Sequence, residues 1–139
     1  MAQDKLNRLR DFAARYTAAW CSQDAASVAA FFSPRGSLTI NGGVPAIGRT
    51  AITEVAQGFM TAFPDLKVYM DDVVEIQGKV TYKWTLDGTN AGPGGTGKRV
   101  RISGFEIWRI GDDGLVAESL GSFDAADYQR QVECGIDGK

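Results

Sequence analysis

Residues 66–88 read LKVYMDDVVEIQGKVTYKWTLDG, and apolar and polar side chains alternate through most of this stretch. Alternation is the period of a β-strand with one buried face. The apolar face of the second half carries Val80, Tyr82, Trp84 and Leu86. The apolar face of the first half carries Leu66, Val68, Met70, Val74 and Ile76, with Asp72 interrupting it. Gly78 lies between the halves, so the stretch predicts two long strands joined by a turn.

The residues before this stretch have helical periods instead. Apolar side chains recur every three or four positions from Lys5 to Trp20, which predicts a first helix. A short second helix is predicted from Ala25 to Phe32, with Asp24 as its N-cap and Pro34 closing it. A third helix is predicted to begin at a Thr50 cap and to stop at Pro64.

Three more strands are predicted outside the opening stretch. They are Gly36 to Ile40, Arg99 to Ile110 and Leu115 to Phe123. The last two flank Asp113-Gly114, which is a strong hairpin signal. A final helix is expected from about Ala125 to Val132.

Helices followed by a meander of strands are typical of the α+β class. We therefore expect a curved antiparallel sheet wrapped around the N-terminal helices, a cone-like α+β barrel with a central pocket. The length of 139 residues fits one domain spanning residues 1–139.

Composition excludes several function classes. The net charge of −2 argues against nucleic-acid binding, and no apolar run is long enough to span a bilayer. The N-terminus lacks an apolar signal core, so a cytoplasmic protein is expected. The chain has no histidine, and Cys21 and Cys134 match no ligand spacing. These facts exclude histidine-based triads and most zinc sites, so we expect no metal and no cofactor.

Several strings, taken in order, resemble the SnoaL-like polyketide cyclase group of the nuclear transport factor two-like superfamily. They are Tyr16-Thr-Ala-Ala-Trp20 with Asp24, Gly48-Arg49, Phe63-Pro64-Asp65-Leu66, Gly88-Thr89-Asn90 with Gly95-Thr96-Gly97-Lys98, Trp108-Arg109-Ile110 with Asp113-Gly114, and Asp124 with Gln131. They cover nearly the whole chain. The order of the strings carries the resemblance more than any single string does.

The resemblance implies a catalytic aspartate at the end of the last strand, which is Asp124 here. Alternation along that strand places Val116, Leu120 and Asp124 on one face. Desolvation raises the pKa of a carboxyl group that faces an apolar pocket, which suits a general acid or base. The alternative role is an N-cap for the helix that follows.

Asn90 occupies the position where the family usually has a histidine. On a regular strand it shares a face with Tyr82, Trp84 and Leu86, where its amide could hold a substrate carbonyl oxygen. The alternative is a turn residue in the glycine-rich connection from Gly88 to Gly97.

Two carboxyl groups, Asp72 and Glu106, lie on otherwise apolar strand faces and are candidate pocket residues. A β-bulge or an edge position that turns either one toward solvent is the favoured alternative. Aromatic side chains are the other candidates for the pocket lining, although such residues are more often plain core. They are Tyr82, Trp84, Trp20, Phe59 and Phe63.

The run from Gly92 to Lys98 has the spacing of a phosphate-binding loop. Arg99 follows where that loop requires Ser or Thr, and strands are predicted on both sides instead of a helix N-terminus. We therefore predict a flexible connection and no phosphate site.

Two function classes follow from these residues. The first is a cofactor-independent enzyme of the cyclase or isomerase type that acts on a small, mostly apolar carbonyl compound. Asp124 would move the proton, and Asn90 with Tyr82 would hold the oxygen. The second is a non-catalytic protein that binds a small apolar or aromatic ligand, which the missing histidine favours. An epoxide hydrolase is a distant third, because it needs an Asp-Arg-Asp group that the sequence does not locate.

A homodimer is also expected, since the resembling fold commonly pairs through its sheets. The strand from Arg99 to Ile110 has apolar residues on both faces. Val100, Ile102, Trp108 and Ile110 lie on one face, and Phe105 and Ile107 lie on the other. The domain's own core can cover only one face, and an exposed apolar patch usually marks an interface.

Overall fold

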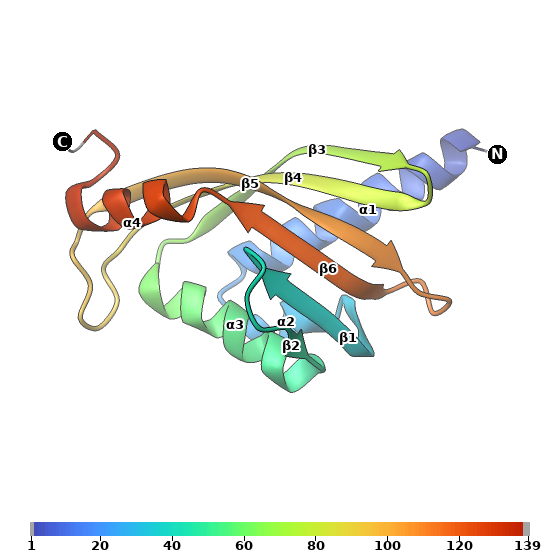
Figure 1. The fold of residues 1–139 in the computed structure, drawn as a ribbon, viewed down its shortest axis with the longest axis horizontal. Helices are drawn as coiled ribbons and strands as arrows, with labels where there is room; N and C mark the ends of the chain where they lie inside the picture. Colours follow the sequence, from blue (N-terminus) through green and yellow to red (C-terminus); the bar gives the residue numbers. More distant parts are fainter. Residues whose placement is uncertain (1, 138–139) are drawn as a thin grey trace.

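The computed structural model describes residues 2–137 (Figure 1). Four helices and six strands follow one another in the order α1, α2, β1, β2, α3, β3, β4, β5, β6 and α4. The helices are α1 (Ala2–Cys21), α2 (Ala25–Ala29), α3 (Arg49–Ala62) and α4 (Ala125–Cys134). The strands are β1 (Phe32–Ile40), β2 (Ala46–Ile47), β3 (Lys67–Ile76), β4 (Lys79–Thr89), β5 (Arg99–Ile110) and β6 (Val116–Phe123).

The strands form one sheet in the order β2-β1-β6-β5-β4-β3. Neighbouring strands are antiparallel except for β1 and β6, which run parallel. The sheet curves without closing, and α1, α2 and α3 lie against its concave face (Figure 1). The predicted α+β class, with a curved sheet around N-terminal helices, is confirmed. None of the helices within residues 2–137 has the length and apolar character needed to cross a bilayer.

The core lies between the concave face of the sheet and α1. Tyr16 of α1 and Trp108 of β5 are fully buried, and their rings meet edge to face at 5.2 Å. The Tyr82 ring of β4 stacks on Trp108 at 4.9 Å. Large rings buried in contact supply much of the apolar area removed from water on folding.

The face predicted for the first long strand is wrong beyond Met70. Met70 pairs with Trp84 and Asp72 pairs with Lys83, so Asp71 is an extra residue in β3. This β-bulge reverses the alternation. Val73 is consequently 1% exposed, whereas Ile76, which was expected to face inward, is 62% exposed.

The second helix is shorter than predicted, and Phe32 begins β1 instead of ending that helix. Pro34 lies within β1, where the register against β6 shifts between Phe32 and Ser37. Proline is tolerated at such an irregularity because a ladder hydrogen bond is already missing there. The third helix also begins earlier than predicted: Gly48 is its N-cap, and Thr50 lies inside it.

Candidate functional site

A cavity opens between the concave face of the sheet and the helices. Its free interior is about 60 Å³. All the empty space between its walls, including the solvent in its open mouth, is about 610 Å³. Most of its wall is apolar. It is lined by Trp20, Leu38, Ile40, Phe59, Val68, Tyr82, Trp84, Leu86, Ile102, Glu106, Gly121, Ser122, Phe123 and Tyr128. A ligand larger than a few atoms must extend into the mouth or move a side chain.

Glu106 is the one acidic side chain in this lining, and it is 7% exposed. Its Oε1 accepts hydrogen bonds from Trp108 Nε1 at 3.0 Å, from Ser119 Oγ at 2.7 Å and from the Tyr16 hydroxyl at 3.0 Å. These donors come from β5, β6 and α1, so three elements together fix the carboxyl group. A bulge was favoured at this position, but the pairing of β4 with β5 is regular from Val80 to Thr89, and Glu106 faces inward.

The environment of Glu106 favours its protonated form. Burial raises the pKa of the carboxyl group above its ordinary value, and the hydrogen bonds from Trp108, Ser119 and Tyr16 oppose that rise without cancelling it. Oε1 accepts from three donors, whereas Oε2 is contacted by only the Tyr16 hydroxyl, at 3.1 Å, among the residues described. A proton held by Glu106 therefore belongs on Oε2.

Tyr82 is the second polar group in the wall, and its hydrogen is already engaged. The Tyr82 and Thr17 hydroxyl oxygens lie 2.5 Å apart, and Thr17 also donates to the Ala13 carbonyl at 2.8 Å. A hydroxyl has one hydrogen, so Thr17 accepts from Tyr82. Burial raises the pKa of Tyr82, so the phenol stays neutral. Tyr82 can donate to a ligand only if this pair breaks.

Aromatic side chains make up much of the cavity lining. The Trp84 and Phe123 rings meet at 5.9 Å, Phe123 and Tyr128 meet at 5.4 Å, and Trp20 meets Phe59 at 6.0 Å. Tyr128 is half-buried, and burial raises the pKa of its phenol. Its hydroxyl has no hydrogen-bond partner within residues 2–137.

Asp124 lies outside this lining. Its side chain is exposed and accepts from the Asp127 backbone N–H at 3.0 Å, which caps α4. The face predicted for the last strand is wrong because Ala117 is an extra residue in β6, between the pairs Arg109–Glu118 and Ile110–Val116. Beyond this bulge Ser119 is buried, and Leu120 is 41% exposed on the outer face. Asp124 thus does not continue a pocket-facing row.

Asn90 is also outside the cavity lining. It is buried, but its Oδ1 accepts from the Thr96 backbone N–H at 2.9 Å, and its backbone N–H donates to the Lys98 carbonyl. These bonds brace the connection between β4 and β5, as expected of the turn residue that we considered. β5 follows that connection directly, so no helix N-terminus stands there to bind phosphate.

The remaining predicted residues divide between cavity and scaffold. Trp20, Phe59, Tyr82, Trp84 and Glu106 all line the cavity. Phe63 is fully buried outside it, and Asp72 lies beside the β3 bulge, with its carboxylate 3.8 Å from the Arg10 guanidinium. Phe123 and Tyr128 also line the cavity and were not predicted from the sequence. Phe123 ends β6 and Tyr128 lies in α4, so their closeness to Asp124 in the sequence is the only signal that could have identified them as lining residues.

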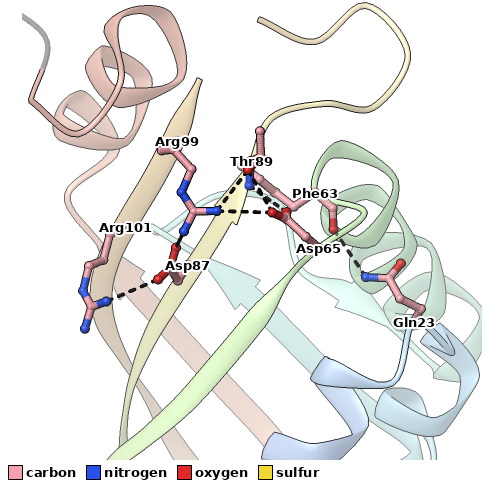
Figure 2. A network of polar contacts seen from close by, with 7 residues as sticks. All are labelled: Gln23, Phe63, Asp65, Asp87, Thr89, Arg99 and Arg101. Atoms are coloured by element: carbon pink, nitrogen blue, oxygen red, sulfur yellow. Dashed lines mark hydrogen bonds and ion pairs between the residues drawn. The ribbon is translucent and has the colours of Figure 1, made fainter. Parts of the chain in front are cut away.

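An Asp-Arg-Asp group does occur, but it is not in the cavity (Figure 2). Arg99 bridges Asp65 and Asp87, and Arg101 also pairs with Asp87. The Arg99 side chain is 52% exposed, and none of the four residues lines the cavity. This exposed network does not form a site for opening an epoxide. Within residues 2–137, no three acidic or cysteine side chains are grouped to hold a metal ion.

Solved structures share this fold at low sequence identity. A hypothetical protein with a ketosteroid isomerase-like fold from Catenulispora acidiphila DSM 44928, in complex with trimethylamine, has a TM-score of 0.76 and 13% identity, with 87% of this chain and 91% of that chain covered. The epoxide hydrolase/cyclase-like enzyme SalBIII, with a role in pyran ring formation in salinomycin, has a TM-score of 0.74 and 18% identity, with 89% and 95% covered.

A protein assigned as a SnoaL-like polyketide cyclase from Jannaschia sp. CCS1 has a TM-score of 0.73 and 16% identity, with 88% and 92% covered. At such identities the likeness concerns the fold alone. No curated protein matches the sequence significantly. The family profile of SnoaL-like polyketide cyclase matches residues 10–132, and on that match this chain belongs to the SnoaL-like polyketide cyclase family.

Proposed function

We propose that this chain is a cofactor-independent acid/base enzyme of the cyclase or isomerase type, with Glu106 as its acid/base group. One observation carries the proposal: Glu106 is a buried carboxyl group, held by three donors, in the wall of an otherwise apolar cavity. Membership of a polyketide cyclase family agrees with this type of reaction. The substrate is a small, mostly apolar carbonyl compound that matches the aromatic lining.

The raised pKa of Glu106 suits both halves of such a reaction. The carboxylate takes a proton from the carbon next to the carbonyl, and the C–H electron pair moves to form an enolate. Protonated Glu106 then returns the proton, to carbon in an isomerisation or to the new alkoxide after the enolate carbon attacks a second carbonyl. The free hydroxyl of Tyr128 is the group we assign to hold the developing oxygen charge.

Hydrogen–deuterium exchange tests the proposal without knowledge of the natural substrate. The probe is 2-tetralone in D₂O, an apolar ketone with an activated CH₂ group, followed by NMR. We expect the wild-type protein to accelerate exchange and Glu106→Gln to lose at least about 10²-fold of that acceleration. Gln can keep the bonds from Trp108 and Ser119 to its Oε1, so the fold should survive.

Asp124→Asn is the matched control, because Asn can still cap α4 and Asp124 is outside the cavity. It should exchange the probe as fast as the wild type. Equal rates for Glu106→Gln and wild type would exclude Glu106 as the base. Loss in Asp124→Asn alone would return the role to Asp124.

A non-catalytic binding function is the second candidate, and one observation favours it. Two polar groups of the wall are already engaged by residues behind it: Tyr82 donates to Thr17, and Glu106 accepts from three donors. If 2-tetralone shifts the amide signal of Gly121 in a saturable way but the wild-type protein does not accelerate exchange of the probe, the cavity binds the ligand without catalysis.

We also propose that two copies pair through the outer face of the sheet. Phe105 is 38% exposed there, and Leu120, which is 41% exposed, lies opposite the half-buried Ile107 in the β5–β6 register. A two-fold axis lets this apolar patch cover itself. Because Phe105 is an exposed apolar member of this patch, a lysine there would place a charge in the interface, and Phe105→Lys should dissociate the pair.

Sedimentation equilibrium measures the pairing directly. The wild type should sediment at twice 14.9 kDa, and Phe105→Lys should sediment at 14.9 kDa. Val44→Lys is the matched control, since Val44 is 93% exposed in the connection between β1 and β2 and belongs to no strand. A wild-type protein that stays at 14.9 kDa at all concentrations contradicts the dimer.

A further inference from the structure

A groove that is separate from the first cavity lies at the end of the sheet away from α4. There α1 passes beside the β3–β4 turn (Figure 1), and Gly114 of the β5–β6 turn also lines the groove. The free interior of this groove is about 560 Å³, compared with about 60 Å³ for the first cavity. It is lined by Lys5, Arg8, Leu9, Phe12, Arg15, Glu75, Gly78, Val80, Ile110 and Gly114. The two linings share no residue.

The floor of the groove is apolar and fixed in place. Phe12 meets the Trp108 ring at 5.8 Å and the Phe31 ring at 5.2 Å, both edge to face. Val80 is 2% exposed, and Ile110 is half-buried beside it. A flat ring or a short hydrocarbon chain placed on this floor would remove apolar area from water on both sides.

The α1 side of the groove is cationic. Lys5, Arg8 and Arg15 lie three and seven residues apart, so they share one face of the helix. Lys5 pairs with Glu75 at 3.2 Å, and Arg15 pairs with Asp11 at 3.0 Å.

Arg8 has no ion-pair partner among residues 2–137. Glu75 is the single acidic residue in the lining, and Asp11, outside it, pairs with Arg15, so Arg8 carries the unpaired positive charge among the described lining residues. This local excess of positive charge occurs in a chain whose net charge is −2.

We propose that this groove binds a small organic anion with an apolar body, such as an aromatic carboxylate. The carboxylate would pair with the Arg8 guanidinium, whose planar donors match its two oxygens, with Arg15 nearby. The apolar body would lie on Phe12 and Leu9. The charge excess explains the anion, and the apolar floor explains why a purely inorganic ion would gain less. This site is independent of the acid/base function proposed for Glu106.

A matched pair of probes tests the site: naphthalene-2-carboxylate and naphthalene-2-methanol, which differ in charge but hardly in shape. Backbone NMR shifts of Gly78 and Gly114 report on the groove, and those of Gly121 report on the first cavity. We expect saturable shifts of Gly78 and Gly114 with the carboxylate, weakened by added salt, and at least about three-fold weaker binding of the alcohol.

Arg8→Gln should weaken carboxylate binding about two- to five-fold, the range for one exposed ion pair. Arg10→Gln is the matched control: it removes the same charge from the same helix, but Arg10 faces Asp72 and does not line the groove. Equal affinity for the two probes, equal weakening by both variants, or shifts confined to Gly121 would each overturn the proposal.

Discussion

Two networks of carboxylates and donors lie on opposite faces of the same sheet. On the inner face, Glu106 is 7% exposed and accepts from Tyr16, Trp108 and Ser119. On the outer face, Arg99 joins Asp65 and Asp87 while its side chain is 52% exposed (Figure 2). β5 contributes to both networks, because even-numbered residues such as Glu106 point inward and odd-numbered ones such as Arg99 point outward.

The difference in solvent exposure decides what each network does. In the interior, a polar group without a hydrogen-bond partner loses its hydration and gains no hydrogen bond to compensate. Each hydrogen bond around Glu106 therefore matters for the stability of the fold. On the surface, water replaces a lost partner and salt screens the charges. A reaction that needs a carboxyl group with a raised pKa therefore fits the inner network. The outer network is suited to stabilising the local structure of the sheet.

Removal of the Glu106 carboxyl group should have the largest effect. Glu106→Ala leaves the Trp108 N–H and the Ser119 and Tyr16 hydroxyls buried without an acceptor, and we expect a loss of about 2–4 kcal/mol in the free energy of unfolding. Glu106→Gln should lose less than half as much, because it keeps an acceptor at Oε1. Urea denaturation of the three proteins measures both. A loss below about 1 kcal/mol for Glu106→Ala would mean that water enters and takes the place of the carboxyl group.

The pH dependence of stability should carry the signature of Glu106. Burial raises its pKa in the folded state, so above the unfolded pKa the folded protein holds a proton that the unfolded chain has released. The contribution of this group is complete below the unfolded pKa of about 4.3 and is lost as pH rises through the folded pKa. Subtraction of the Glu106→Gln unfolding curve from the wild-type curve isolates this slope. A flat difference above that pH would show an unshifted carboxyl group.

Asp124 should contribute through the helix that it caps. Asp124→Ala removes the bond to the Asp127 N–H and should lower the free energy of unfolding by about 1 kcal/mol, whereas Asp124→Asn should change it by a few tenths. Because α4 carries Tyr128, Asp124→Ala should also weaken ligand binding in the cavity. The same stability loss in both variants would mean that the negative charge matters more than the cap.

The sequence predicts regular strands well and irregular ones poorly. β5 has the predicted bounds, Arg99 to Ile110, and its pairing with β4 contains no bulge. The alternation of β3 and β6 is interrupted at Asp71 and Ala117, and single extra residues leave no sign in a pattern of polar and apolar letters. The prediction that Asp124 lies on the pocket-facing side of β6 was wrong for that reason, whereas its alternative role as the N-cap of α4 is confirmed.

The candidate site was predictable only in part. Glu106 and four aromatic lining residues follow from strand and helix periods. The donors of Glu106 come from α1, β5 and β6, and Tyr16 is 90 residues away in sequence. Contacts at that separation depend on how the elements pack, which the local patterns do not contain.

The smallest effect is expected on the outer face, from Arg99→Gln. Both Arg99 and Asp65 are about half exposed, so we expect a loss below about 1 kcal/mol that shrinks further at about 1 M salt. Burial is the largest single influence on the pKa of Asp65 and acts to raise it, but the lowering contributions together outweigh it; the two hydrogen bonds from Thr89 are the largest of these and the charge of Arg99 is the smallest. Asp65 should therefore keep its lowered pKa in Arg99→Gln and lose more of the shift in Thr89→Ala, which removes the side-chain hydrogen bond. A carbon-13 NMR titration of Asp65 compares the two variants. A larger change in Arg99→Gln would show that the ion pair, and not the hydrogen bonds, sets the behaviour of this carboxylate and that the outer network is less screened than its exposure implies.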